Sequence, residues 1–180
     1  MAIKIQGSNN KNILYFAIGS TVAFILYITF VLTPTGACFK LDSGSNSLGL
    51  SFSYTKDIVL SFFESRSQEQ LRCYSQFLKI WDAIFAVIYT LMYASWIVCL
   101  FNNKRWLALI PFLGMVSDWS ENYIELLMIK AYSNAEVISE TIVSLGSGIN
   151  SFKWALSGLT YLIILIGIII AIINFFTKTR

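Results

Sequence analysis

The sequence predicts an all-α fold: an integral membrane four-helix bundle with both termini in the cytoplasm and short amphipathic helices in its outer loops. The first observation is composition, because 56% of the 180 residues are apolar and only 13% are charged, whereas a soluble domain carries about 25% charged residues. The mean hydropathy is +0.66. The second observation is that four windows are long and apolar enough to span a bilayer, which requires roughly 20 residues. These windows are 13–32, 80–101, 106–129 and 152–176.

The third observation is the distribution of basic residues. Segments 1–12, 102–105 and 177–180 contain Lys and Arg but no acid. Because Lys and Arg concentrate on the cytoplasmic side of membrane proteins, these segments and both termini are predicted to be cytoplasmic. Residues 1–180 show no repeat or linker and are expected to form a single transmembrane domain. The lipid bilayer is the expected partner, a homo-oligomer or a larger membrane complex is left open, and no basic tract points to nucleic acid.

The first window is predicted to be a retained helix. Residues 13–32 are too long for the apolar part of a typical signal peptide, and no A-x-A cleavage site follows. The outer loop, 33–79, begins with an irregular stretch rich in Gly and Ser. Apolar residues at 58, 59, 62 and 63 then predict a short amphipathic helix at the outer interface. An oxidising compartment would allow the two cysteines of this loop, Cys38 and Cys73, to form a disulfide.

The second window is predicted to be the end of a longer helix. Ser67-x-x-Gln70 is a capping-box pattern, and it places the helix start near Gln68. The helical pattern then continues without a break to about Phe101. The short turn 102–105 makes the second and third helices an antiparallel hairpin.

The third and fourth windows are separated by a second outer loop, 131–151. Pro111 lies one turn into the third window, where a proline would kink the helix modestly. Within the loop, 135–145 has an amphipathic pattern and is followed by Gly146-Ser147-Gly148. These features predict a short helix, then a break, and then the fourth spanning helix from Phe152.

Polar residues gather on one face of the third window. Asp118, Glu121, Asn122 and Glu125 fall within an arc of about 100° when successive residues are placed 100° apart. The second and fourth windows carry polar faces of their own, and the three faces are expected to meet in the interior. The candidate binding site therefore comprises Asp82, Asp118, Glu121, Asn122, Glu125, Lys153 and Tyr161.

The charges of this candidate site do not balance, because four acids face one well-placed lysine. Buried carboxylates without partners take up a proton or require a cation, and ionisable residues inside a membrane point to function. We therefore expect a site that binds or handles a small polar or cationic ligand, a lipid headgroup or a proton. One alternative is a structural subunit of a larger membrane complex, in which the polar contacts only hold helices together. Another is a membrane-embedded lipid-modifying enzyme with Asp118 and Glu121 as acid and base.

The absence of histidine limits the chemistry of the site. The chain contains no His, which removes the usual zinc and non-haem iron sites and the Ser-His and Cys-His nucleophile pairs. Carboxylates three residues apart are able to share a hard cation such as Mg²⁺, but a bound metal is the less favoured option and none is predicted. No cofactor is identified, and a non-enzymatic role is favoured.

Several of these residues follow the pattern of a known family. A Tyr and then an Asp open the second span, a Pro and D-x-x-E-N occupy the third, and Lys-Trp opens the fourth. The matching residues are Tyr74, Asp82, Pro111, Asp118 to Asn122, and Lys153-Trp154.

Over roughly residues 54–160 the chain thus resembles an uncharacterised family of small, mostly bacterial four-span membrane proteins. The resemblance implies a location in the bacterial inner (plasma) membrane but no activity. The family often has Gly-Arg before the Tyr, whereas this chain has Leu71-Arg72-Cys73-Tyr74.

Overall fold

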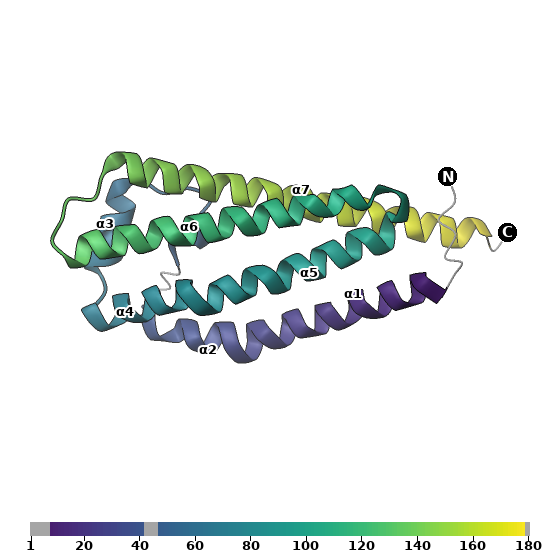
Figure 1. Cartoon of the computed structure of the whole chain (residues 1–180), viewed down its shortest axis with the longest axis horizontal. Coiled ribbons are helices and arrows are strands. Elements are labelled where there is room, and N and C mark those ends of the chain that lie inside the picture. The colour runs from purple at the N-terminus through teal and green to yellow at the C-terminus, as the bar shows by residue number, and fades with distance from the viewer. Residues whose placement is uncertain (1–7, 42–46, 179–180) are drawn as a thin grey trace.

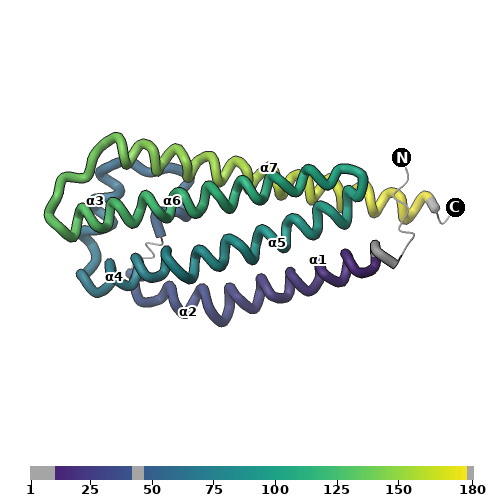
Figure 2. The backbone as a smooth tube through the Cα atoms, viewed as in Figure 1, coloured from purple at the N-terminus to yellow at the C-terminus, as the bar shows by residue number. Residues whose placement is uncertain are grey.

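The computed structural model describes residues 8–41 and 47–178, and within these ranges the protein is helical and contains no strand. The helices form four long segments, which lie side by side along the long axis of the molecule (Figure 1). The start of the first and the end of the last lie at one end, together with the turn between the middle two (Figure 2). The main helices are α1 (Ser8–Tyr27), α5 (Ala83–Leu100), α6 (Leu109–Ser133) and α7 (Glu140–Lys178).

The first helical segment is longer than predicted. The prediction that the outer loop begins at Thr33 is wrong, because α1 continues through a π-helical turn, η1 (Ile28–Leu32), into α2 (Thr33–Gly36) and η2 (Ala37–Phe39). Pro34 does not stop the helix. It follows directly after the π-helical turn η1, and local π-helical adjustments allow a membrane helix to accommodate a proline. A disulfide between Cys38 and Cys73 then joins the end of this segment to the next helix.

The second helical segment begins where the sequence predicts. Ser67 accepts a hydrogen bond from the backbone N–H of Gln70, and the Gln70 side chain accepts one from the N–H of Ser67. This capping box satisfies two otherwise unpaired donors at the start of α4 (Gln68–Gln76). The helix continues through a π-helical segment, η4 (Phe77–Asp82), and then α5 to Leu100.

The third segment begins later than predicted. Trp106 belongs to the 3-10 turn η5 (Asn102–Ala108) and is 64% exposed, and the α-helix starts only at Leu109. Pro111 is therefore in the first turn of α6, where it removes no intrahelical hydrogen bond and needs no kink. At its other end α6 continues to Ser133, beyond the expected end at Ile129.

The fourth segment is one continuous helix. A separate helix at 135–145 with a break before Phe152 is contradicted, because α7 starts at Glu140 and runs through Gly146 and Gly148. The physical reason lies in packing: a Cβ atom at Gly146 would come within 2.5 Å of the Tyr54 hydroxyl oxygen. Gly146 thus provides space for a neighbouring loop and does not end the helix.

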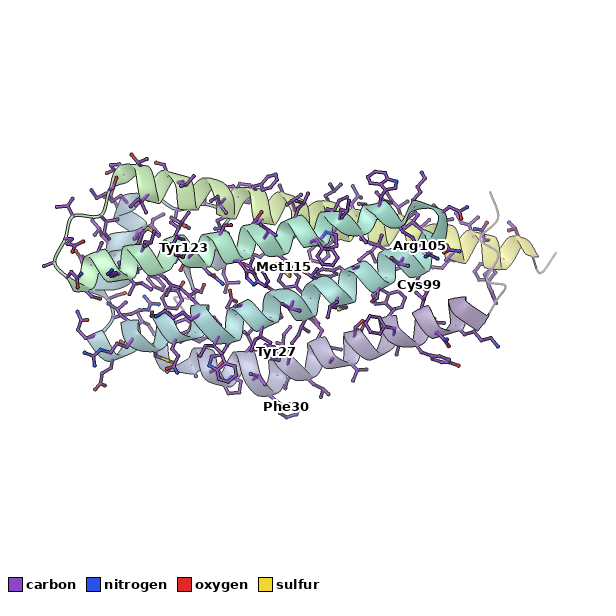
Figure 3. All side chains as sticks on the ribbon, viewed as in Figure 1. Tyr27, Phe30, Cys99, Arg105, Met115 and Tyr123 are labelled. Atoms are coloured by element: carbon purple, nitrogen blue, oxygen red, sulfur yellow. A yellow bond between two sulfur atoms is a disulfide. The ribbon has the colours of Figure 1, made fainter. Side chains whose placement is uncertain are left out.

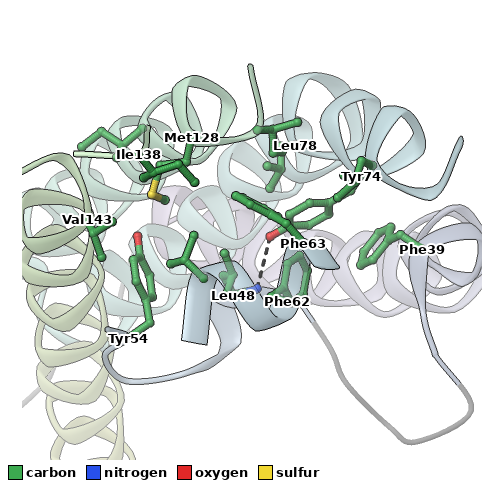
Figure 4. Packing of buried hydrophobic residues seen from close by; sticks show 14 of the residues in the cluster. Phe39, Leu48, Tyr54, Phe62, Phe63, Tyr74, Leu78, Met128, Ile138 and Val143 are labelled. Carbon is green, nitrogen blue, oxygen red and sulfur yellow. Dashed lines mark hydrogen bonds between the residues drawn. The ribbon is translucent and has the colours of Figure 1, made fainter. Parts of the chain in front are cut away.

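The segments pack as two pairs. α1 lies along α5, α6 lies along α7, and α5 contacts both α6 and α7. The outer loop folds over the end opposite the chain termini as η3 (Leu48–Leu50) and α3 (Lys56–Glu64). α3 buries Val59, Phe62 and Phe63, which join a hydrophobic cluster with residues of the long helices (Figure 4).

Apolar side chains cover the outside of the long helices (Figure 3). Phe30 is 72% exposed and Tyr123 is 64% exposed. Among the described residues, three helices are long and apolar enough to cross a membrane: Lys11–Phe39, Gln68–Leu100 and Glu140–Thr177. Large exposed apolar surfaces of this kind point to association with a membrane.

Candidate functional site

The centre of the candidate site is Lys153 of α7, which lies between two carboxylates of α6. Its Nζ is 3.0 Å from Asp118 Oδ1 and also donates a hydrogen bond to Glu121 Oε2. Asp118 and Glu121 are one helical turn apart, so both face α7, and both are buried. Removing one partner of such a group leaves an uncompensated buried charge, which is strongly destabilising.

The outer loop covers the group formed by Lys153, Asp118 and Glu121. The carbonyl oxygen of Gly49, in η3, accepts hydrogen bonds from Lys153 Nζ at 3.3 Å and from Trp154 Nε1 at 3.1 Å. A Cβ atom at Gly49 would be 3.1 Å from Glu121 Oε1. Glycine therefore allows the loop backbone to approach the buried ion pair closely.

A second acidic group lies on the side facing α5. Asn122 Nδ2 donates a 2.7 Å hydrogen bond to Asp82 Oδ2 at the end of η4. Tyr89 donates its hydroxyl hydrogen to Asp118 Oδ2 at 3.2 Å. Within the part of the chain that the structure describes, Asp82 has no Lys or Arg within ion-pairing distance. Among the described residues, Asp82 and Glu125 are thus the two acids of the candidate site without a cationic partner.

Glu125 lies further toward the loop end of α6. It is fully buried and accepts a hydrogen bond from the Tyr74 hydroxyl. Tyr74 in turn accepts a 3.2 Å hydrogen bond from the backbone N–H of Leu48, drawn as a dashed line in Figure 4. Glu125 is thus linked to the loop and not to Lys153.

Among the residues that the structure describes, three buried oxygen atoms in this region have no hydrogen-bond partner: Glu121 Oε1, Glu125 Oε1 and the hydroxyl of Tyr54. Burial, with the charges of Glu125 and Glu121 nearby, raises the pKa of the Tyr54 hydroxyl. Tyr54 therefore stays protonated beside the two carboxyl groups. Such unpaired oxygens are costly unless a shared proton or a water molecule satisfies them.

A cavity of about 320 Å³ lies next to Asp82, Asp118, Asn122 and Lys153. Its polar end is formed by these side chains. Its other walls are mostly apolar or aromatic and come from α1, η1, η3, η4, α5 and α7: Phe24, Leu32, Ser47, Gly49, Leu50, Phe77, Phe85, Tyr89, Tyr93, Trp154, Ser157 and Tyr161. Concave, mainly apolar sites with a few convergent polar groups are typical of ligand-binding pockets.

The seven predicted site residues do not form one network. Lys153 joins Asp118 and Glu121, Asn122 joins Asp82, and Glu125 pairs with Tyr74 (above). Among the described residues, Tyr161 forms no hydrogen bond with any of the acids. It is 52% exposed, accepts or donates a 2.8 Å hydrogen bond with Tyr93, and lies at the edge of the cavity.

Several contributing residues carried no clear sequence signal. Tyr54 and Gly49 lie in a loop without periodicity, so only the structure brings them to the acids. Tyr74 is part of the family pattern, but its hydrogen bond to Glu125 could not be deduced from spacing. Arg72, whose role the pattern left open, is exposed.

The comparisons with known proteins do not identify this site. No family model matches the chain, and no curated protein or solved structure is significantly similar to it. What the site does must therefore follow from its own residues, charges and cavity.

Proposed function

We propose that the protein crosses the membrane four times and binds a small cationic group in the cavity beside Asp82 and Asp118. The observation that carries this proposal is the excess of acid there. Lys153 is already shared by Asp118 and Glu121, while among the described residues Asp82 accepts a hydrogen bond only from the neutral amide of Asn122. A bound cation next to Asp82 would reduce the unbalanced charge.

The shape of α6 supports the fourth crossing. Its 25 residues span about 37 Å at 1.5 Å per residue, which exceeds the roughly 30 Å hydrocarbon core. Its buried acids face the other helices, while Leu113, Val116 and Tyr123 are exposed on other faces. The acids that lower its hydropathy are therefore hidden from lipid, as expected for polar residues in membrane helices.

The cavity suits an ammonium group in particular. Carboxylates at Asp82 and Asp118 offer charge-assisted hydrogen bonds or ion pairing. The rings of Phe85 and Tyr89 line the same cavity, and aromatic faces attract cations by about 0.5–2 kcal/mol. Acids and aromatic rings together favour a cation over an anion.

Two observations favour a binding role over an enzymatic role and over a purely structural role. In the enzyme hypothesis Asp118 and Glu121 act as acid and base, but both are engaged by Lys153, which opposes proton exchange with a substrate. In the structural hypothesis the contacts only hold helices together, yet Asp82 borders a cavity and not a packed interface. We therefore propose a binding protein.

The experiment is a titration of the purified protein in detergent with choline, a water-soluble ammonium compound. Asp82→Asn removes the charge while preserving size, and it should weaken choline binding roughly tenfold, the loss expected for a hydrogen-bonded or paired charge. Glu64→Gln, which removes an exposed acid at the end of α3, should leave binding unchanged.

The titration, combined with unfolding measurements, distinguishes a binding role from a purely structural one. Unfolding midpoints of both variants are measured without choline. If Asp82→Asn lowers the midpoint while choline binds equally to wild type and variant, or to neither, the binding proposal is wrong.

A further inference from the structure

We propose that the natural ligand is a membrane lipid with an ammonium head group, bound with its head at Asp82 and Asp118 and its chain in the opening between α1 and α7. This inference rests on the proposed function and adds the class of ligand and its route of access. Three features support it: the opening between the helices, the aromatic row along its floor, and the closed loop end.

The geometry points to an opening of the cavity between α1 and α7. These two helices lie on opposite sides of the molecule in Figure 1, and each packs on a different neighbour, α1 on α5 and α7 on α6. Phe24 of α1 and Tyr161 of α7 both line the cavity. Because Tyr161 is half exposed, the cavity is open along its side, where the four-span arrangement would place lipid.

A row of aromatic rings, each in contact with the next, lies along this opening. Phe24 stacks on Phe85 with ring centroids 5.5 Å apart, and Phe85 contacts Tyr89 at 5.4 Å. Tyr89 contacts Tyr93 at 5.8 Å, and Tyr93 contacts Tyr161 at 5.4 Å. The row runs from α1 across α5 to α7, directly beside Asp118, which accepts the Tyr89 hydrogen bond.

This row suits both parts of an amphiphile. Near the acids the ring faces attract an ammonium group, and the same rings offer apolar contact to a hydrocarbon chain. Tyr161 is followed one turn later on α7 by Leu165, which is also exposed. An acyl chain leaving the cavity past Tyr161 would thus stay on an apolar surface.

Access from the loop end is restricted. η3 covers the polar end, and the Gly49 carbonyl is held by Lys153 and Trp154. Leu50, on the same turn, also lines the cavity. A water-soluble ligand arriving from the loop side would have to displace this turn, whereas a lipid would enter sideways between α1 and α7.

The inference is tested by photo-crosslinking in nanodiscs made from equal amounts of phosphatidylcholine and phosphatidylglycerol with identical acyl chains. The photoreactive p-benzoylphenylalanine replaces Tyr161 in one protein and Tyr123 in the matched control. Tyr123 is an exposed tyrosine of α6 that does not line the cavity. The ratio of crosslinked phosphatidylcholine to phosphatidylglycerol is measured by mass spectrometry.

The ratio at position 161 should exceed that at position 123 by roughly threefold or more, as an ammonium–aromatic interaction of moderate strength implies. Asp82→Asn should reduce it to the control ratio. Phe85→Leu keeps an apolar side chain but removes the ring that joins α1 to the row, and it should also reduce the crosslinking ratio at position 161. This variant replaces Asp82→Asn in the test if Asp82→Asn does not fold.

Equal ratios at positions 161 and 123 overturn the lipid inference. If choline still binds in the titration above, the proposed cation site stands and only its lipid ligand is wrong. If choline binding is absent as well, both proposals fail. A raised ratio at 161 that persists in both variants also overturns the inference, because the acids and the aromatic row would then play no part.

Discussion

Two buried tyrosines near the acids of α6 have opposite hydrogen-bonding status. The Tyr74 hydroxyl donates to Glu125 and accepts from the N–H of Leu48. The Tyr54 hydroxyl has no hydrogen-bond partner among the described residues. Both side chains are buried, so replacement by phenylalanine isolates the hydroxyl group in each case.

The two substitutions should affect stability differently. Tyr74→Phe leaves the buried Glu125 carboxyl and the Leu48 N–H without that partner, and it should lower the free energy of unfolding by about 2 kcal/mol. Tyr54→Phe removes a buried hydroxyl that is already unpaired, so it should leave the free energy of unfolding unchanged or raise it. Denaturant unfolding in detergent measures both. A larger loss for Tyr54→Phe would show that its hydroxyl has a partner, such as a water molecule bridging it to the carboxyl groups.

Individual site residues were predictable only where helical periodicity applied. The spacing of Asp118, Glu121 and Asn122 places them on one face of any helix, and that face is buried in the structure. Periodicity gives no information about a loop, so the Gly49 carbonyl could not be assigned to Lys153. It also gives no partners, so the separate pairing of Glu125 with Tyr74 was not foreseen.

At the scale of elements, two glycines of α7 occupy different environments. A Cβ atom at Gly146 would lie 2.5 Å from the Tyr54 hydroxyl oxygen and 2.9 Å from Ile124 Cγ2. A Cβ atom at Gly148 would have no atom within 4 Å. The two positions are in the same helix and two residues apart, so helix propensity affects them equally.

Alanine should therefore have opposite effects at these positions. Gly146→Ala should destabilise the protein by about 1–3 kcal/mol, because the surrounding atoms must move. Gly148→Ala should stabilise it by up to about 1 kcal/mol, because alanine is the better helix former. Unfolding midpoints of the two variants test this. Adding Tyr54→Phe to Gly146→Ala should recover part of the loss; no recovery would mean that the close contact with Tyr54 is not its cause.

Some helix boundaries were predictable from the sequence, and others were not. The capping box at Ser67 is a local signal, and the helix begins where it indicates. Gly146-Ser147-Gly148 is also a local signal, but the helix break that it predicts is absent. In a helix held by tertiary contacts, a glycine also allows a neighbouring segment to pack closely. The outer loop is predicted to begin at Thr33, yet the helical segment continues through α2 to Phe39. Helix ends set by neighbouring segments cannot be derived from one segment alone.

At the scale of the whole molecule, α6 decides the topology. The other three long segments have the length and hydropathy of membrane spans, while α6 carries three of the four carboxylates of the site, Asp118, Glu121 and Glu125. If α6 crosses, the turn η5 and the 134–139 connection lie on opposite sides of the membrane. In that arrangement the exposed bases of η5, Lys104 and Arg105, would place this turn and both termini in the cytoplasm by the positive-inside rule.

Single cysteines placed at the two ends of α6 should therefore differ in accessibility from outside the cell. In a Cys99→Ser background, whose other two cysteines form the disulfide, Val137→Cys should react with a membrane-impermeant maleimide in intact cells. Asn103→Cys should react only after the cells are permeabilised. Both positions are exposed, Val137 by 87%, so burial cannot account for a difference. Equal labelling of both in intact cells would place the two ends of α6 on one side. The acids of α6 would then not lie inside a membrane bundle, and the four-span arrangement on which the lipid site depends would be wrong.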